Sequence, residues 1–340
     1  MLYIISFLLS FVFSAIITPL IIKLAKNLKI IDEPKEPRKL HGKPTPLLGG
    51  LAIFLSLAIS IGIFLYTGKI LDSSITMSSI LAIFFGGAIL QIGGAIDDVF
   101  DLKPEIQILF PCLAAIVAMY FGIRVDFITN PFGGVIGIAY WLSIAITFLW
   151  LLGIMYTTKF LDGLDGLVAG QALIGSIIIF VVSLFWDISQ SGTSYISLMV
   201  AGVCLGFLLY NFYPAKIFLG EGGSVFLGFM LGILSIISGS KIATAMLIMG
   251  LPIIDTIWVI AKRIQRGKSP FVGDRTHFHF KLLERGLNQK QAVIFMYGIT
   301  IIFGAISLFL GTKGKIFAII FLVAFSIIVL NKLYIKKTYE

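Results

Sequence analysis

The sequence predicts an all-α integral membrane protein of about eleven transmembrane helices, forming one domain over residues 1–340. Three observations predict this fold class. Hydrophobic residues make up 58% of the chain and charged residues only 13%, which is more apolar surface than a water-soluble fold of this length can bury. Apolar runs of about 20 residues, the length that crosses a bilayer, recur along the chain. Acidic residues collect where these runs begin or end.

The apolar runs give the expected spans in chain order. The first, 2–25, has no charged segment before it and no cleavage-site pattern after it, so we expect it to be retained. The others are expected at 48–67, 77–96, 105–122, 135–156, 166–187, 195–212, 224–240, 242–261, 291–311 and 314–331. Two longer polar stretches, 26–47 and 262–290, are expected to be cytoplasmic loops.

The distribution of positive charge sets the expected orientation. With the N-terminus outside and the C-terminus cytoplasmic, 21 of the 26 Lys and Arg residues lie on the inner side, as the positive-inside rule requires. This bias, together with attraction to anionic lipid headgroups, accounts for most of the net charge of +9. Because the sequence has no basic soluble module, nucleic acid is not an expected partner.

Two pairs of aspartates lie at span ends on the expected inner face. Asp97 and Asp98 end the third span, and adjacent helical residues point about 100° apart, so one can hold a metal ion while the other meets a substrate. A polar helix end dipping into the headgroups is the alternative, but it opposes the helix dipole. Asp162 and Asp165, each followed by Gly, share a face if the segment is helical, or else cap the next span.

A third acidic motif, G-E-G-G-S, contains Glu221. We expect a glycine-rich loop at 220–223 whose backbone N–H groups can face phosphate, with Ser224 capping the following span. A glutamate there is a hard oxygen ligand for Mg²⁺. Taken alone, an ordinary glycine turn with one solvated acid is the better interpretation.

The three histidines all fall in the two expected inner loops. The i,i+2 spacing of His277 and His279 puts both rings on one side of an extended strand. With Arg275 nearby, contacts to phosphate or sugar are favoured, while a zinc site lacks further ligands in the sequence and a basic stretch lying on lipid stays open. The same phosphate and lipid interpretations apply to His41.

Other polar residues in the expected spans have plainer explanations. Cys112 and Cys204 each lie inside a span, where we expect packing residues rather than a disulfide or a metal pair. Asp255 lies near the inner end of the ninth span. It either pairs with Lys262 or Arg263, or meets a substrate.

Five segments, taken in order, resemble the polyprenyl-phosphate N-acetylhexosamine-1-phosphate transferase family. They lie between about residues 32 and 287 and read R-K-L-H-G-K-P-T-P-L-L-G-G, G-A-I-D-D-V-F-D-L, F-L-D-G-L-D-G-L-V-A-G, Y-N-F-Y-P-A-K-I-F-L-G-E-G-G-S and D-R-T-H-F-H-F-K-L-L. The resemblance implies an all-helical protein with a cytoplasmic active-site cleft in the bacterial cytoplasmic membrane. A homodimer is compatible with it.

The resemblance also implies an activity. It implies transfer of N-acetylhexosamine-1-phosphate, GlcNAc-1-phosphate in the first place, from a UDP-sugar to undecaprenyl or another polyprenyl phosphate, with release of UMP. This is the first membrane step of cell-envelope glycan synthesis, such as that of lipopolysaccharide or teichoic acid. Mg²⁺ is the implied cofactor, with Mn²⁺ as an alternative.

The matched motifs carry expected roles onto this chain. Asp97 and Asp98 are the expected catalytic pair, and Glu221 with Asp98 the expected metal ligands. The expected substrate-binding residues are Lys159, Asp162, Asp165, Asn211, Arg275, His277, His279 and His41.

Five positions depart from the pattern of the family. Glu221 stands where the family has aspartate, Lys159 where it has asparagine, and Leu47 where it has arginine. Gln107 and Pro111 stand in place of a lysine and a glutamine. We expect Lys159 to replace part of the missing positive charge toward phosphate.

The short H-F-H-F run favours the WecA/TagO-like branch, whose donors are unsubstituted UDP-N-acetylhexosamines. The alternatives are a phospho-MurNAc-pentapeptide transferase of the MraY type and, less favoured, a membrane transporter or a non-catalytic scaffold. A transporter places its acids near the bilayer midplane and commonly has repeated halves, whereas here the acids lie at span ends.

Overall fold

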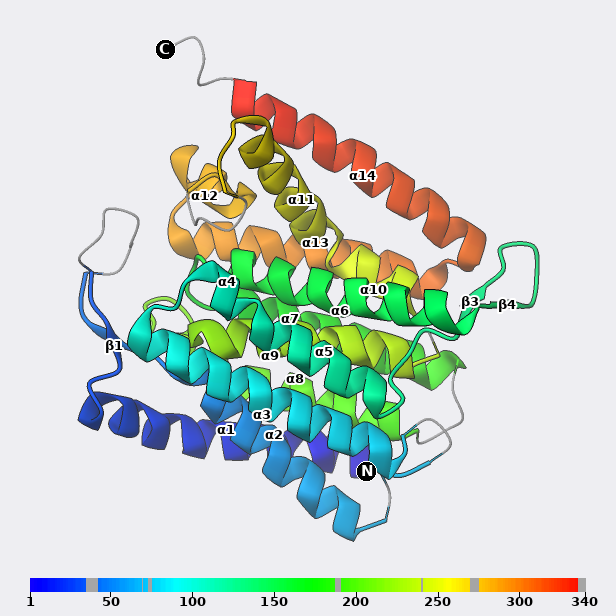
Figure 1. Cartoon of the computed structure of the whole chain (residues 1–340), viewed down its shortest axis with the longest axis horizontal. Helices are drawn as coiled ribbons and strands as arrows, with labels where there is room; N and C mark the ends of the chain where they lie inside the picture. Colours follow the sequence, from blue (N-terminus) through cyan, green and yellow to red (C-terminus); the bar gives the residue numbers. More distant parts are fainter. Residues whose placement is uncertain are drawn as a thin grey trace.

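The long helices lie side by side in one bundle (Figure 1). The computed structural model describes residues 1–34, 42–68, 70–72, 75–186, 191–239, 241–269 and 275–335. Within these ranges nine helices are long and apolar enough to cross a membrane, which confirms the predicted fold class. They are α1 (Leu2–Asn27), α2 (Gly49–Tyr66), α3 (Met77–Phe100), α6 (Tyr140–Leu161), α7 (Leu167–Trp186), α8 (Gly192–Asn211), α9 (Gly220–Ile237), α13 (Gln289–Phe309) and α14 (Thr312–Ile335).

The two remaining expected spans are helical but differ from a straight crossing. The stretch at 105–122 forms the short helices α4 (Pro104–Gln107) and α5 (Leu109–Tyr120). The stretch at 242–261 forms α10 (Ile242–Ile248) and α11 (Gly250–Gln265), bent by 75° at the break between them. Pro252 lies in the first turn of α11 and has no N–H to continue the ladder of α10, which explains why the helix breaks there.

Short elements occupy the ends of the bundle. At one end β1 (Ile31–Asp32) pairs antiparallel with β2 (Thr45–Pro46), and α12 (Phe278–Glu284) follows α11. At the other end β3 (Phe127–Thr129) and β4 (Val135–Gly137) form an antiparallel hairpin. Two expectations are corrected here, since the span expected from 135 begins at Tyr140 after this hairpin, and part of the loop expected at 262–290 is helical.

The N-terminal helix packs through small polar residues rather than through its apolar ones. A Cβ added at Gly202 or Gly206 of α8 would collide with the α1 backbone, so the two helices touch main chain to main chain. The Ser14 hydroxyl donates a hydrogen bond across this seam to the Val203 carbonyl at 2.8 Å. The buried polar residues of α1 recur every four positions, at Ser6, Ser10, Ser14 and Thr18.

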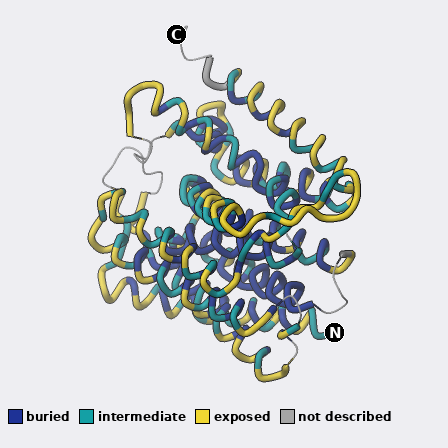
Figure 2. The backbone as a smooth tube through the Cα atoms, turned by 45° about the vertical axis from the view of Figure 1, so that its right-hand side comes forward, coloured by how far each residue is buried: buried dark blue, intermediate teal, exposed yellow. Residues whose placement is uncertain are grey.

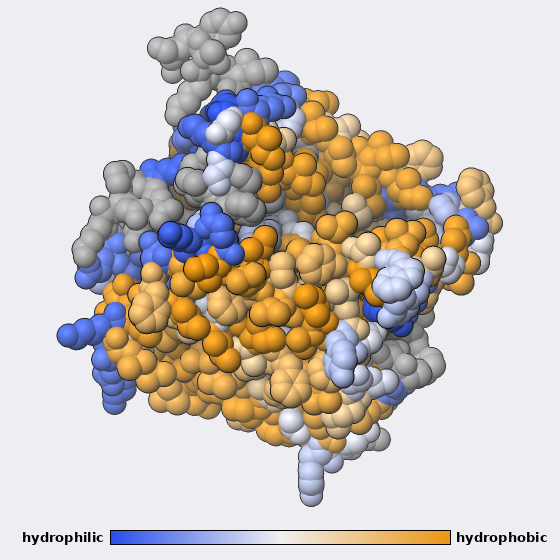
Figure 3. All heavy atoms as spheres, in the orientation of Figure 1, coloured by the Kyte–Doolittle hydropathy of each residue, from blue (hydrophilic) through white to orange (hydrophobic). Residues whose placement is uncertain are grey.

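Exposed and buried helices, and apolar and hydrophilic surfaces, are separated in the molecule. Helices α8 and α9 lie deep in the bundle, while α14 is largely exposed (Figure 2). An apolar surface covers the middle of the face in Figure 3, and hydrophilic side chains gather mainly at the end that carries β1 and α12. The start of α1 and the end of α14 lie at opposite ends of the bundle, as an odd number of crossings requires (Figure 1).

Candidate active site

Three helix ends meet where backbones touch without side chains between them. A Cβ added at Gly94 of α3 would collide with the backbone of Gly222 in α9, and one at Gly50 of α2 would collide with Gly223. The Gln91 side chain strengthens this contact by donating a hydrogen bond to the Gly222 carbonyl at 3.1 Å. The close approach brings the acidic end of α3 against the first turn of α9.

Asp98 and Glu221 become neighbours through this contact. Asp98 Oδ1 accepts the backbone N–H of Glu221 at 3.1 Å, so the carboxylate satisfies a free N–H group at the start of α9. The loop predicted at 220–223 is therefore wrong, because α9 begins at Gly220, which has a φ of +71°. Ser224 is not a cap, since its hydroxyl donates back to the Glu221 carbonyl at 3.1 Å.

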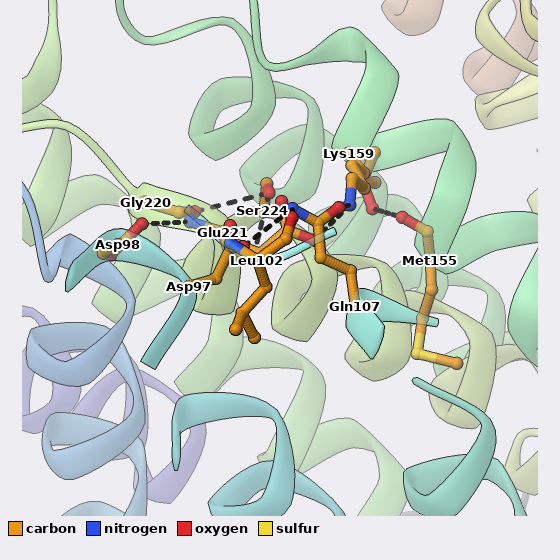
Figure 4. A network of polar contacts seen from close by, with 10 residues as sticks. Asp97, Asp98, Leu102, Gln107, Met155, Lys159, Gly220, Glu221 and Ser224 are labelled. Atoms are coloured by element: carbon orange, nitrogen blue, oxygen red, sulfur yellow. Dashed lines mark hydrogen bonds and ion pairs between the residues drawn. The ribbon is translucent and has the colours of Figure 1, made fainter. Parts of the chain in front are cut away.

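A chain of polar contacts links four side chains that come from four helices (Figure 4). Asp97 Oδ1 accepts from Gln107 Nε2 at 2.7 Å, and Gln107 Oε1 accepts from Lys159 Nζ at 2.8 Å. The Lys159 ammonium lies 2.5 Å from Glu221 Oε1. We call Asp97, Gln107, Lys159 and Glu221 the polar chain. Asp97 and Asp98 thus diverge, each toward different partners.

Three positions at which the sequence departs from the family pattern are therefore in direct contact. Gln107, Lys159 and Glu221 are consecutive members of the polar chain. Sequence reasoning assigned no role to Gln107, and its departure from the pattern was the one signal that pointed to it. The predicted span ended at residue 156, which placed Lys159 in the loop after it. In the structure α6 continues to Leu161, and Lys159 lies within its last turn.

The turn that follows α6 carries the two aspartates of D-G-L-D-G. Residues 162–166 form a turn and not a helix, so Asp162 and Asp165 do not share a helical face. Asp165 Oδ2 accepts the Ala215 N–H at 2.9 Å and so joins this turn to the loop before α9. The Asp162 side chain reaches solvent, but protein atoms surround its carboxyl group and leave it poorly hydrated. This loss of hydration, followed by the charges of Glu221, Asp165 and Asp98, raises the pKa of Asp162 to about 8.

His277 directly precedes α12 as its N-cap residue and His279 lies in the first turn of α12, so the two histidines do not share an extended strand. Its Nδ1 lies 2.9 Å from Asp255 Oδ2, and Asp255 Oδ1 accepts the Phe278 N–H at 3.0 Å. Asp255 thus contacts His277, and the pairing with Lys262 or Arg263 offered as one interpretation is wrong. All three groups are buried, so the carboxylate fixes both the helix start and the orientation of the imidazole.

The two histidines pack against the last turn of α6 and the turn that follows it. Their rings lie 5.8 Å apart and are nearly parallel, and Phe160 stacks on the other face of His277 at 5.6 Å. A Cβ added at Gly163 would collide with His279 Nε2, so the ring occupies the space that this glycine leaves. Burial, followed by the nearby charge of His277, lowers the pKa of His279 well below its usual range, so its imidazole is neutral near pH 7.

Polar atoms in this region have capacity for a ligand. In the part of the chain that the structure describes, His277 Nε2 and both ring nitrogens of His279 are buried without a hydrogen-bond partner. Buried polar atoms normally find one. The histidine stack therefore offers acceptor and donor positions to a polar molecule.

Three other residues that we expect to bind substrate are Asn211, Arg275 and His41. Asn211 is buried at the end of α8, and its amide donates to the Ile217 carbonyl at 2.9 Å, which holds the loop before α9. Arg275 is exposed just before α12. His41 lies outside the described residues. The predicted substrate contacts of these three stay predictions.

The donor chemistry of the site suits a hard divalent cation. Among the described residues no three His, Cys, Asp or Glu side chains are placed to hold an ion together. Mg²⁺, however, usually keeps several waters and takes only one or two carboxylates plus substrate phosphates. Asp98 and Glu221, adjacent through the bond between Oδ1 and backbone N–H, can supply these two carboxylates. A pocket of about 10 Å³ beside Glu221, lined by Asp97, Gln107 and Glu221 together with six apolar or glycine residues, has room for about one water molecule.

The fold and the site together define an integral membrane enzyme that has acidic, ammonium and imidazole groups at one end of a helical bundle. Comparison with known proteins agrees with this class. The profile of glycosyl transferase family 4 matches residues 80–239. The probable undecaprenyl-phosphate N-acetylglucosaminyl 1-phosphate transferase of Bacillus subtilis is 34% identical to this chain, covering 88% of it and 82% of the relative.

Two further relatives cover comparable shares. The decaprenyl-phosphate N-acetylglucosaminephosphotransferase of Mycobacterium leprae is 32% identical over 82% of this chain and 76% of its own length. The phospho-N-acetylmuramoyl-pentapeptide-transferase of Halalkalibacterium halodurans is 29% identical over 89% of this chain and 95% of its own length. The chain belongs to glycosyl transferase family 4, a family of membrane-integral sugar-phosphate transferases. The resemblance predicted from the five motifs is confirmed.

Proposed function

We propose that this protein transfers GlcNAc-1-phosphate from UDP-GlcNAc to undecaprenyl or another polyprenyl phosphate and releases UMP. The observation that carries the proposal is the convergence of Asp98, Glu221, Lys159 and Asp162 at one end of the bundle. The Bacillus subtilis and Mycobacterium leprae relatives named for GlcNAc-1-phosphate transfer, at 34% and 32% identity, exceed the pentapeptide transferase at 29%. These two relatives favour an unsubstituted UDP-N-acetylhexosamine as the donor.

The reaction brings two anions together. An oxygen of the lipid phosphate attacks the sugar-linked phosphorus of the donor, and the bond to the UMP oxygen breaks, so the sugar phosphate moves and the charge leaves on UMP. Lys159 supplies a positive charge within the cluster that can face the diphosphate. Asp97 and Asp98 orient the lipid phosphate or take its proton. Because the second pKa of a phosphate is near neutral, positioning contributes more than proton removal.

Asp98 and Glu221 would hold a divalent cation, Mg²⁺ or Mn²⁺, which when bound would neutralise the donor diphosphate and the departing charge. The other proposed substrate contacts form two groups. Asp162 and Asp165 would face the nucleotide. The residues proposed to contact the sugar phosphates are Arg275, His277, His279 and His41, with Asn211 shaping the loop beside them.

The proposed setting is the bacterial cytoplasmic membrane, with the site on the cytoplasmic face. It is supported by the positions of 21 of 26 Lys and Arg residues. The end of the bundle that carries the site is also the end of β1 and α12, where hydrophilic side chains gather (Figure 3).

The test uses the purified full chain with Mg²⁺, undecaprenyl phosphate and a panel of UDP-sugars that includes UDP-MurNAc-pentapeptide. We expect UMP release and a lipid-linked product with UDP-GlcNAc. Asp98→Ala and Glu221→Ala should each abolish turnover while the protein stays folded, whereas Asp126→Ala, which removes an acid from the opposite end, should not. Turnover with the pentapeptide donor alone would assign the MraY type, and normal turnover in both Asp98→Ala and Glu221→Ala would overturn the site.

A further inference from the structure

The amide of Gln107 is matched at both of its ends. Its Oε1 accepts from the Lys159 ammonium at 2.8 Å, and its Nε2 donates to Asp97 Oδ1 at 2.7 Å and to the Leu102 carbonyl at 3.0 Å. An acceptor therefore faces the cation and a donor faces the carboxylate. This arrangement fixes which way the amide points, because the reversed amide would set like against like at both contacts.

At the Glu221 end of the polar chain, the ammonium group of Lys159 lies beside a carboxylate. Lys159 Nζ lies 2.5 Å from Glu221 Oε1, and both side chains are less than one-fifth exposed. The backbone N–H of Glu221 is bound to Asp98, so the Asp98 carboxylate lies beside the first turn of α9, from which the Glu221 side chain extends. Two negative charges in neighbouring positions repel one another unless a positive charge lies between or beside them. In the described residues Lys159 is the cation in contact with Glu221.

We propose that Lys159 is a built-in counter-ion that holds Glu221 until a divalent cation takes its place, and that Gln107 is the positioning residue that keeps Lys159 at the site. The inference rests on the metal ligands of the proposed function. Once Glu221 is engaged by the metal, the bond from Lys159 to Gln107, itself anchored on Asp97, retains the ammonium beside the cluster. The released ammonium then faces the diphosphate of the donor.

Two consequences follow from this competition. Without the ammonium, Glu221 is more available, so a divalent cation should bind more tightly although catalysis fails. A lysine at position 107 should be harmful beside Lys159, because two ammonium groups would meet, yet tolerable when position 159 is a neutral amide. In that double variant the positive charge lies at position 107 instead of position 159, next to Asp97 in the polar chain.

The experiment measures Mn²⁺ binding to the substrate-free protein by electron paramagnetic resonance, together with UMP release. Lys159→Gln keeps a polar head that can bond to both neighbours, so folding should be retained. We expect it to bind Mn²⁺ about tenfold more tightly than the wild type while losing at least 100-fold in turnover. Lys216→Met removes an exposed lysine from the loop before α9 and should leave the Mn²⁺ affinity unchanged.

Gln107→Lys and the double variant Gln107→Lys/Lys159→Gln complete the set. We expect the double variant to recover at least tenfold in turnover over either single variant, a non-additivity that independent sites do not show. Unchanged or weaker Mn²⁺ binding in Lys159→Gln would overturn the counter-ion, and a double variant no better than the singles would overturn the role of Gln107. If Lys159→Gln does not fold, Lys159→Met supplies the same measurement.

The proposed function and this inference fail in different ways. A wild-type protein that releases no UMP with any UDP-sugar contradicts the proposed function, while its Mn²⁺ affinities still test the counter-ion. An active wild type whose affinity does not respond to Lys159→Gln contradicts the counter-ion alone.

Discussion

Asp98 acts on α9 as a capping side chain does, but from a different helix. Its Oδ1 accepts the N–H of Glu221 in the first turn, where four N–H groups of any α-helix lack intrahelical partners. One carboxylate therefore fixes the position of the next one. Any substitution at Asp98 changes both the charge of the site and the placement of Glu221.

Asp255 carries a prediction about orientation. Replacing Asp255 by Asn removes the charge that accepts from both His277 and Phe278, so the imidazole loses its fixed orientation. We expect turnover to fall roughly ten- to a hundredfold, the range that such supporting contacts carry. Steady-state kinetics on UMP release should show the loss mainly in kcat. Asp255→Glu should recover part of it, and Asp126→Asn, on the opposite end, should have no effect. If Asp255→Asn lowers the stability of the protein but leaves kcat unchanged, Asp255 has a purely structural role.

Asp162 carries a prediction about pH. The unfolded chain releases this proton near pH 3.8, whereas the folded protein holds it up to about pH 8. The folded state therefore binds more protons between these values, and this group makes the metal-free protein less stable as pH rises from about 4 to 8. A divalent cation nearby favours the ionised form, so Mn²⁺ affinity should rise with pH and level off above about 8.

Titration calorimetry between pH 6.5 and 9 checks this dependence. At pH 7 we expect Mn²⁺ binding to release protons, seen as heats that vary with the ionisation enthalpy of the buffer. Asp162→Asn should remove most of the slope. A slope that survives this substitution would place the titrating group elsewhere.

The sequence identifies the charged members of the candidate site more readily than the neutral ones. Asp97, Asp98 and Glu221 stand out because an acid beside an apolar run is costly. Gln107 does not stand out, since its contact with Lys159 joins residues 52 positions apart and its meaning depends on that contact. For the same reason the partner of Asp255 could not be chosen from its neighbours in the chain.

Among the elements, α1 and α8 are joined by a seam of direct backbone contact that a single substitution can test. A Cβ at Gly206 would meet the Phe11 carbonyl and Ser14. We expect Gly206→Val to separate the helices and lower the stability of the protein by about 1–3 kcal/mol. Thermal unfolding in detergent should show the drop. Gly62→Val, at a helical glycine with open space around it, is the matched control. Equal effects of the two substitutions would mean that helix propensity and not the seam is responsible.

Element types were predicted more securely than element ends. Each of the eleven expected spans is helical, because long apolar runs allow no other structure in a bilayer. The hairpin β3–β4 was missed because Val135 and Ile136 continue an apolar run into α6. The start of α9 at Gly220 was missed because glycines predict a loop, whereas here they allow backbone contact with α2 and α3.

The whole molecule carries a prediction about orientation. The start of α1 and the end of α14 lie at opposite ends of the bundle, and positive charge favours a cytoplasmic C-terminus (Figure 1). A fluorescent protein fused after the last residue should fluoresce in cells, whereas alkaline phosphatase fused at the same place should be inactive. The opposite pair of results would place the site on the outer face, away from cytoplasmic UDP-sugars.

Gly163 lets two distant segments interlock at the end of the molecule that carries the site. With no side chain there, the ring of His279 fills the gap, and Phe160 covers His277 from the other side. The segment after α6 and the start of α12, more than 100 residues apart in the chain, are thereby wedged into one block. A ligand that displaces either segment therefore has to displace the other as well, so we expect the two segments to move together.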